Sequence, residues 1–204
     1  MLSNVYGHFL NRFWPLFWKY RHFWDKDWAE SYASEESLSH PHRTLLLEAV
    51  SKFEPFDSLI EYGSGPGANL YRISKRFPNA KLYGIDLSDM ALKKGRELFK
   101  NNPKVKFLKS RPRGKLDLYL TDAFLIYKDY LAASHLIFKI TDDAEPIAYI
   151  GCEWHDEKGT FEHGRHWVHN FKKLLPGCEL RKLTWDDWQD EGWSTYGHII
   201  TWIR

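Results

Sequence analysis

The sequence is poor in cysteine and lacks any long hydrophobic run. Only two of its 204 residues are cysteines, Cys152 and Cys178, too few for the set of disulfides that stabilises small secreted domains. No segment has the pattern of a secretory signal peptide, and no apolar stretch approaches the roughly 20 residues of a transmembrane helix. These absences predict a cytoplasmic protein that folds in a reducing environment.

An excess of charge of one sign is also missing. Lys and Arg number 29 against 27 Asp and Glu, which gives a formal net charge of +2. Proteins that bind nucleic acid usually concentrate positive charge on one face, whereas the basic residues of this chain are scattered. We interpret the densest basic stretch, residues 104–115, as a solvated strand edge and loop. The composition therefore argues against a nucleic-acid partner.

Aromatic residues, in contrast, are abundant and crowd the N-terminus. The sequence holds ten tryptophans, and several fall within residues 9–28, where aromatic side chains follow helical spacing. We expect residues 1–57 to form an N-terminal helical extension, with a helix over 41–52 that has Pro41 at its first position. Three roles are open to the aromatic segment: a lid over a bound ligand, a peripheral contact with a membrane interface, or a dimer contact. The oligomeric state stays open.

From residue 58 onward, short apolar runs alternate with helix-like stretches. Strands are expected over 58–62, 81–85, 104–109, 116–120 and 146–152, and helices over 69–76, 89–99 and 130–138. For the tail we expect a helix over 163–175 and strands over 179–184 and 198–203, with an aromatic, acidic loop over 185–196. Such alternation is typical of a mainly parallel sheet with helices on both faces.

A glycine-rich turn follows the first of these strands. Residues 61–67 read Glu-Tyr-Gly-Ser-Gly-Pro-Gly, so an apolar run ends in an acid, turns through three glycines and opens into a helix. A turn of this kind lets a nucleotide-like ligand lie against backbone N–H groups, because no Cβ stands in the way. Asp86 ends the next apolar run, where a carboxylate can grip the two hydroxyls of a ribose. Together these features predict a site for an adenosine-containing cofactor.

NAD is one such cofactor, because Gly63, Gly65 and Ala68 satisfy the dinucleotide pattern G-x-G-x-x-G/A. Three features argue against it. Glu61, at the end of the strand, would repel a pyrophosphate but face a positively charged ammonium. More than fifty residues precede this strand, and the C-terminus is expected to form strand, loop and strand rather than further strand–helix units.

The pattern E-x-G-x-G-x-G, with Gly84-Ile-Asp86-Leu87-Ser88 after it, resembles the class I S-adenosylmethionine-dependent methyltransferases. The resemblance extends from Ser58 to Arg204. It implies an α/β fold: a three-layer α-β-α sandwich with a mainly parallel, seven-stranded, Rossmann-like sheet that ends in an antiparallel strand pair. Residues 58–204 would form the domain that binds S-adenosyl-L-methionine, and residues 1–57 the helical extension or lid.

The resemblance also implies a set of cofactor-binding residues. Glu61 would orient the methionine ammonium, Asp86 would accept hydrogen bonds from the ribose, and Leu87 would press on the adenine. The segment that ends at Tyr32 resembles the W-x(n)-Y stretch that often precedes the glycine motif in this superfamily, so Tyr32 is expected to act as a lid residue. The full expected set is Tyr32, Glu61, Tyr62, Gly63, Ser64, Gly65, Gly67, Asn69, Asp86, Leu87 and Asp122.

Three residues are candidates for the catalytic base. Asp122 follows the fourth strand, close to where the reactive methyl would lie, and Tyr127 comes shortly after it. His155 is the only candidate whose unperturbed pKa is near neutrality. We expect no metal, because the histidines at 163, 166 and 169 progress around the predicted helix rather than share one face. Cys152 is interpreted as a buried structural thiol.

These observations predict a methyltransferase that uses S-adenosyl-L-methionine and acts on a small-molecule or lipid-like acceptor. The chain has no Asn-Pro-Pro-Tyr-like element after the fourth strand, which argues against amide or adenine nitrogens as acceptors. Two alternatives stay open. One is a non-catalytic partner subunit that binds the cofactor, and the other is an RNA methyltransferase, which would need the basic residues of 104–115 to face the cofactor crevice.

Overall fold

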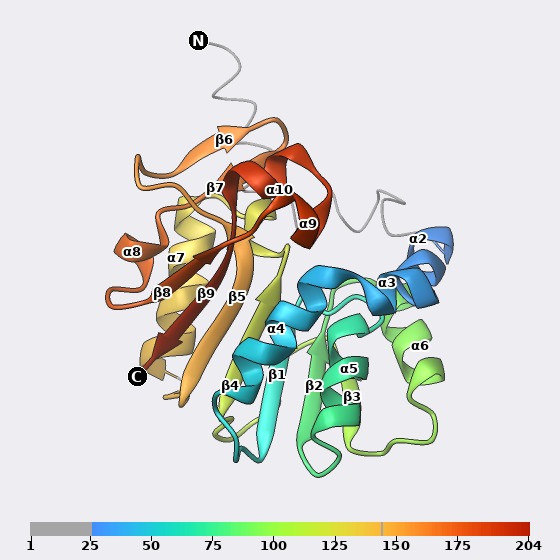
Figure 1. Cartoon of the computed structure of the whole chain (residues 1–204). Helices are drawn as coiled ribbons and strands as arrows, with labels where there is room; N and C mark the ends of the chain where they lie inside the picture. Colours follow the sequence, from blue (N-terminus) through green and yellow to red (C-terminus); the bar gives the residue numbers. More distant parts are fainter. Residues whose placement is uncertain (1–25, 144) are drawn as a thin grey trace.

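The computed structural model describes residues 26–143 and 145–204, which form a seven-stranded sheet with the strand order β3-β2-β1-β4-β5-β9-β8 (Figure 1). The strands are β1 (Ser58–Tyr62), β2 (Lys81–Ile85), β3 (Val105–Leu108), β4 (Leu118–Asp122), β5 (Ala148–Trp154), β8 (Glu179–Lys182) and β9 (Gly197–Ile203). Strands β1 to β5 pair in parallel, and β9 runs antiparallel to both β5 and β8. The predicted Rossmann-like sheet with its antiparallel C-terminal pair is confirmed.

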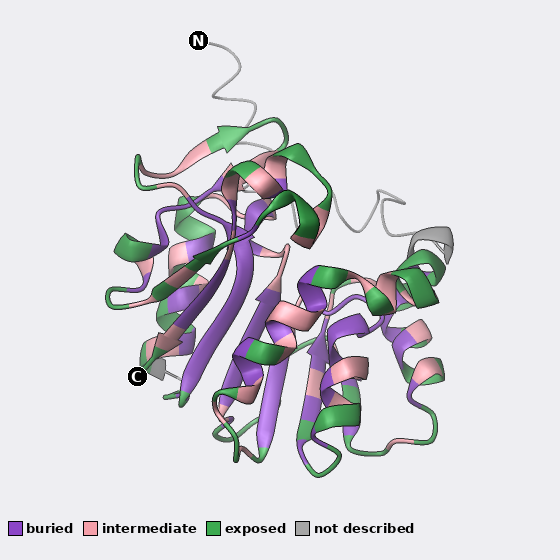
Figure 2. Cartoon of the chain, in the orientation of Figure 1, coloured by how far each residue is buried: buried purple, intermediate pink, exposed green. Residues whose placement is uncertain are grey.

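Helices cover both faces of this sheet. Helices α4 (Pro41–Ser51), α5 (Ala68–Arg76) and α6 (Asp89–Leu98) contribute to one hydrophobic cluster, and α7 (Tyr130–Phe138) and α8 (Phe171–Leu174) contribute to the other. Neighbouring residues of one strand enter different clusters, because successive side chains of a strand point to opposite faces. Leu59 packs with the first cluster and Ile60 with the second. The central strands are accordingly buried almost throughout (Figure 2), and the predicted three layers are confirmed.

Several helices begin where the sequence signals a start. The Ser88 hydroxyl accepts a hydrogen bond from the Ala91 N–H at 3.1 Å, and the Asp129 carboxylate accepts one from the Ala132 N–H at 2.8 Å. Such side chains satisfy N–H groups that the first turn of a helix leaves without an intrahelical partner. Pro41 occupies the first turn of α4, where a missing N–H costs nothing. The predicted helices over 41–52, 69–76, 89–99 and 130–138 are confirmed to within a residue at their ends.

The tail differs from the prediction in two places. The predicted helix over 163–175 is wrong: β6 (Phe161–His163) and β7 (His166–Val168) form a hairpin, and the chain is helical only in α8. Gly164 turns the hairpin with a φ of 64°, a conformation that glycine adopts without strain. The region predicted as a loop over 185–196 contains α9 (Trp185–Trp188) and α10 (Glu191–Tyr196). Thr184 and Asp187 form a capping box at the start of α9, a signal that the sequence analysis missed.

Strands β4 and β5 each lie two residues further along the chain than predicted. Asp122 is therefore the last residue of β4, paired with Cys152 of β5. Because β4 ends at the centre of the sheet, this shift places the Asp122 carboxylate at the edge where ligands bind in open α/β sheets.

Two short helices, α2 (Lys26–Tyr32) and α3 (Glu35–Ser39), lead into α4. Of the aromatic segment over residues 9–28, the part up to residue 25 lies outside the described residues. The division at residue 57 stays a prediction, although Leu46, Ala49 and Val50 of α4 belong to the same core cluster as the sheet. Of the helices that the structure describes, none is both long and apolar enough to span a membrane.

Helix α7 offers a test of the second layer. Ile137 is 2% exposed and Leu131, on the same helix, is 72% exposed. We expect Ile137→Ala to lower the free energy of unfolding by about 2–5 kcal/mol, because it leaves a cavity in the core. Leu131→Ala should change it by less than about 0.5 kcal/mol. Urea denaturation followed by circular dichroism measures both, and equal effects of the two variants would contradict this packing.

Candidate active site

A cavity of about 820 Å³ opens at the carboxyl ends of the central strands. The strand order reverses between β1 and β4, and ligands of open α/β sheets bind at such a reversal. The volume lies within the range of small-molecule and cofactor sites. Eleven of the predicted site residues line the cavity: Tyr32, Glu61, Tyr62, Gly63, Ser64, Gly65, Asn69, Asp86, Leu87, Asp122 and Tyr127. Gly67 and His155 do not.

The glycine turn fits tightly between neighbouring side chains. Gly63, Gly65 and Gly67 have φ values of 70°, 53° and 91°, in the left-handed region that glycine tolerates best. A Cβ on Gly63 would lie 2.3 Å from the Phe124 ring, and one on Gly67 would lie 2.6 Å from the Phe107 ring. Both positions therefore need glycine on two grounds, the backbone conformation and the space.

The N–H groups of this turn bind the protein itself, which corrects the expectation that they face a ligand. The amides of Gly63 and Ser64 donate to the Ile85 carbonyl at 2.8 and 3.1 Å, and the Gly65 amide donates to Asp86 Oδ2 at 2.9 Å. The Gly67 amide donates to the Ser64 carbonyl. The turn is thus fastened to the end of β2, and it offers a ligand close approach rather than free donors.

Asp86 is held in place by this turn and by its own loop. Its Oδ2 accepts from Gly65, and its Oδ1 accepts from the Ser88 N–H at 2.8 Å. A carboxylate oxygen has two acceptor positions, so each oxygen retains one for another donor. Burial raises the Asp86 pKa above its ordinary value. Leu87, beside it, is 61% exposed at the cavity wall.

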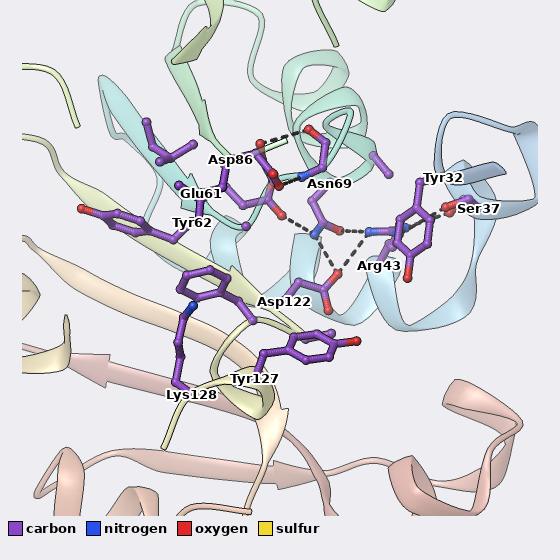
Figure 3. Close-up of a pocket in the computed structure, with 18 of the residues that line it drawn as sticks. Tyr32, Ser37, Arg43, Glu61, Tyr62, Asn69, Asp86, Asp122, Tyr127 and Lys128 are labelled. Carbon is purple, nitrogen blue, oxygen red and sulfur yellow. Dashed lines mark hydrogen bonds and ion pairs between the residues drawn. The ribbon is translucent and has the colours of Figure 1, made fainter. Parts of the chain in front are cut away.

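Asn69 connects the two acids of the strand ends. Its amide nitrogen donates to Glu61 Oε1 at 2.7 Å and to Asp122 Oδ2 at 2.9 Å, and its Oδ1 accepts from Arg43 Nη1 at 2.8 Å. Arg43 Nη1 also donates to Asp122 Oδ2 at 3.1 Å. Figure 3 shows Asn69 between Glu61 and Arg43, with Asp122 directed toward both Asn69 and Arg43. Three of these four residues were predicted from the sequence, and Arg43 was not.

The two acids differ in charge state. Burial raises the pKa of Glu61 to about 8, and its Oε2 has no hydrogen-bond partner among the residues that the structure describes. Burial also opposes ionisation of Asp122, but His42 and Arg43 outweigh it and hold the Asp122 pKa well below its usual range. Asp122 is therefore an anion paired with Arg43, and its Oδ2 is engaged by Arg43, His42 and Asn69. Glu61 is left as a buried acid that lacks a cation.

Two histidines at the start of α4 complete this cluster, and neither was predicted as a site residue. His42 Nε2 lies 3.0 Å from Asp122 Oδ2, and its Nδ1 lies 2.5 Å from His40 Nδ1. The His42 ring stacks on Trp188 of α9, with ring centroids 3.8 Å apart. Both histidines line the cavity. Burial lowers the pKa of His42 and lowers that of His40 to about 4, so both rings are neutral at pH 7.

A helical-periodicity signal could have identified these residues. His42 and Arg43 stand four and three positions before Leu46, which places them on the apolar side of the helix. Polar side chains on the buried side of a helix need partners inside the protein. A cluster of functional side chains is one way to provide such partners.

The far side of the cavity is formed by the segment after β4. Burial raises the pKa of Tyr127 to about 12, which leaves its hydroxyl protonated at neutral pH. Lys128, which the sequence analysis did not select, places its Nζ 4.7 Å from the centre of the Phe124 ring, and burial lowers its pKa. This side is therefore aromatic with one cationic group.

His155 is brought to a different place. Its Nδ1 accepts a hydrogen bond from the Phe171 N–H at 3.0 Å, and it is 5% exposed. It fastens the chain at the start of α8 to the end of β5 and does not reach the cavity. Within residues 26–143 and 145–204, no group of three or more His, Cys, Asp or Glu side chains is arranged to hold a metal ion.

A family model described as a methyltransferase domain matches residues 59–126. The match contains the glycine turn, Asp86 and Asp122, which line the cavity. The chain thus carries a segment similar to a methyltransferase domain, and that segment contains the residues at the centre of the cavity. Comparison with curated protein sequences gave no match.

Solved structures of methyltransferases share the fold of this chain. An O-methyltransferase family protein from Burkholderia thailandensis matches with a TM-score of 0.65 and 15% identity, over 88% of this chain and 60% of that chain. Magnesium protoporphyrin IX methyltransferase from Synechocystis, solved with bound S-adenosylmethionine, has a TM-score of 0.57 and 18% identity, over 80% of this chain and 77% of that chain. Geranyl diphosphate C-methyltransferase from Streptomyces coelicolor has a TM-score of 0.62 and 14% identity, over 79% of this chain and 76% of that chain. The chain thus spans less than two thirds of the first of these proteins, and at such identities the likeness concerns the fold.

The raised pKa of Glu61 predicts how the stability of the ligand-free protein depends on pH. The folded state holds the Glu61 proton up to about pH 8, whereas the unfolded state releases it near the ordinary value of 4.5. This acid therefore makes folding less favourable as pH rises between these values, by a few kcal/mol in total. We expect Glu61→Gln to be more stable than the wild type at pH 8, with a difference that shrinks toward pH 5. Urea denaturation at both pH values measures it, and a pH-independent difference would contradict it.

Proposed function

We propose that this chain is a class I S-adenosylmethionine-dependent methyltransferase, which transfers the methyl group of S-adenosyl-L-methionine to a small-molecule or lipid-like acceptor that binds in the same cavity. The observation that carries the proposal is the extent of the cavity. It reaches from Glu61 and Asp86 past Asp122 to α7 and to the helices before β1. A site for the donor alone would not need to include residues of α3 and α7. The extra space supports a second ligand beside the donor.

Donor binding is proposed to rest on Glu61, Asp86 and Leu87. The unpartnered oxygen of Glu61 suits the methionine ammonium, because a buried carboxylate is stabilised by a cation. The two remaining acceptor positions of Asp86 suit the ribose hydroxyls, and Leu87 offers an exposed apolar surface for the adenine. When bound, the sulfonium of the donor supplies an already activated methyl group. The protein then mainly has to align the acceptor and exclude water.

The acceptor is proposed to lie against the aromatic side of the cavity. Phe124, Tyr127 and Leu136 provide apolar surface there, with Lys128 as the cationic group. Tyr32 of α2 borders the same cavity and keeps the proposed role of a lid. A peripheral membrane contact through the aromatic N-terminus remains part of the proposal for a lipid-like acceptor. Its residues lie outside the described part of the chain.

The RNA alternative gains little support. Lys109 and Arg111 of the basic stretch do line the cavity. However, Lys109 pairs with Asp89 at 2.8 Å, and Arg111 Nε donates to the Tyr119 hydroxyl at 2.6 Å. Their charged groups therefore bind other parts of the protein. The other alternative, a non-catalytic partner subunit, predicts that the chain binds the methyl donor but methylates no acceptor.

Calorimetric titration with S-adenosylhomocysteine tests the donor site. We expect the wild type to bind and Asp86→Ala to bind at least about tenfold more weakly, because the variant loses hydrogen bonds to a charged group. Asp186→Ala is the control, since Asp186 is an exposed acid outside the cavity. Absence of heat for the wild type, together with binding of NAD, would reject the proposal.

Proton release tests the role of Glu61. At pH 6 the free protein carries the Glu61 proton, and pairing with an ammonium requires the carboxylate. Affinity for S-adenosylhomocysteine should therefore rise from pH 6 to pH 7.5, on the order of tenfold. In Glu61→Gln this rise should disappear. If it persists, another group, such as the buried Glu153 with its pKa raised to about 7, is the one that titrates.

A further inference from the structure

A row of three hydrogen-bonding side chains leads from the end of β4 to the cavity wall. Asp122 Oδ2 lies 3.0 Å from His42 Nε2, and His42 Nδ1 lies 2.5 Å from His40 Nδ1. The side chains of His42 and Asp122 are 3% and 8% exposed, whereas His40 is half-buried. The row therefore begins at a buried anion and ends at a ring that borders the cavity.

The protons of this row are fixed by its anionic end. An ionised carboxylate can only accept hydrogen bonds, so His42 must donate its Nε2–H to Asp122. A neutral imidazole carries a single N–H, and His42 Nδ1 is then an acceptor. His40 must donate its Nδ1–H to it, which leaves the lone pair of His40 on Nε2. The arrangement thus selects for His40 the tautomer with a free acceptor nitrogen.

We propose that His40 Nε2 is the general base of the reaction and that the acceptor presents a hydroxyl group, so that methylation occurs on oxygen. His42 acts as a positioning residue that holds the His40 tautomer, and Asp122 anchors the row. This inference rests on the proposed function and names the substrate class of the same cavity.

With a hydroxyl acceptor, one bond forms and one bond breaks at the methyl carbon, and the hydroxyl loses its proton. The acceptor oxygen uses a lone pair to bond the methyl carbon, and the carbon–sulfur bond breaks with its electron pair on sulfur, which leaves S-adenosylhomocysteine. The O–H bond breaks with its pair on oxygen, and the proton moves to His40 Nε2. A shift of the His40 Nδ1 proton to His42 then places the positive charge beside the Asp122 carboxylate. The pKa of His40, lowered to about 4, still permits this step, because the hydroxyl proton becomes strongly acidic as its oxygen gains positive charge on bonding to the methyl carbon.

The surroundings hold the two imidazoles of this row in a fixed orientation and keep both of them neutral. The charged or titratable groups that act on His40 are His42 and Arg43 of α4 and Asp122 of β4. Trp188 of α9 covers both imidazoles, with ring centroids 3.8 Å from His42 and 5.3 Å from His40. Trp188 is itself stacked on Trp193 at 3.8 Å. A base held by packing in a fixed orientation needs no reorganisation when the acceptor binds.

Nuclear magnetic resonance of the imidazole nitrogens tests the row without any acceptor. Long-range proton–nitrogen correlation spectra of the full chain at pH 7 report which nitrogen of each ring carries the proton, and His40→Gln assigns the His40 signals. We expect a proton on Nδ1 of His40 and on Nε2 of His42. In His42→Phe, which keeps an aromatic ring against Trp188, the His40 proton should move to Nε2, the nitrogen that free neutral imidazoles prefer. Wild-type His40 protonated on Nε2 would overturn the proposal.

Methyltransferase activity provides a second test of the proposed base. Wild type and His40→Gln are assayed with radiolabelled S-adenosylmethionine and a panel of phenols, alcohols, amines, thiols and carboxylic acids. We expect product from hydroxyl compounds, a 10²- to 10⁴-fold lower kcat for His40→Gln, and an affinity for S-adenosylhomocysteine within about twofold of the wild type. His163→Gln, on the exposed β6–β7 hairpin, should leave kcat unchanged. Full turnover by His40→Gln, or product from amines alone, would overturn the inference. Failure of the wild type to bind S-adenosylhomocysteine would instead reject the proposed function.

Discussion

The site depends on how two acids are buried beside a single arginine. Glu61 is the penultimate residue of β1 and Asp122 the last of β4, two parallel neighbours at the point where the strand order reverses. Their side chains therefore lie close together in the cavity at this edge of the sheet. Arg43 pairs with Asp122 at 3.1 Å, and Asn69 bridges the two acids. Arg43 therefore balances the charge of Asp122 alone, and burial keeps Glu61 protonated. A cationic ligand is the natural complement of that imbalance.

Helix α4 serves both the core and the site. Its apolar residues, such as Leu46 and Val50, are almost fully buried against the sheet. The same helical face continues one turn earlier as His42 and Arg43, which reach the end of β4. The packing of the helix therefore sets the position of the polar groups. Trp188 and Trp193, from a region that the sequence suggested was a loop, stack behind His42 and so connect the C-terminal part of the chain to the site.

The sequence allowed the glycine turn and Asp86 to be predicted as neighbours in the cavity, because these residues are close together in the chain. The glycine turn and the acid at the end of β2 follow a fixed spacing, since both are set by one strand–helix–strand unit. The rest of the cavity comes from segments far apart in sequence: α4, the end of β4, α7 and α9. No local pattern links them. His155 was selected for its ordinary pKa, yet in the fold it binds the backbone at the start of α8. The prediction of a helix over 163–175 was wrong because a short hairpin with β-branched and aromatic residues can match helical spacing over a few positions.

The sequence by itself determined the fold class and the order of the strands and helices of the core, and it predicted an adenosine-containing cofactor, because hydrophobic periodicity, capping residues and glycine spacing are local properties. Only the tertiary structure decided the charge states of Glu61 and Asp122 and the alignment of Asp122 with the two histidines at residues 40 and 42. It also decided that the N–H groups of the glycine turn donate to other parts of the protein. Burial and hydrogen bonding set these features, and both depend on which distant segments come together.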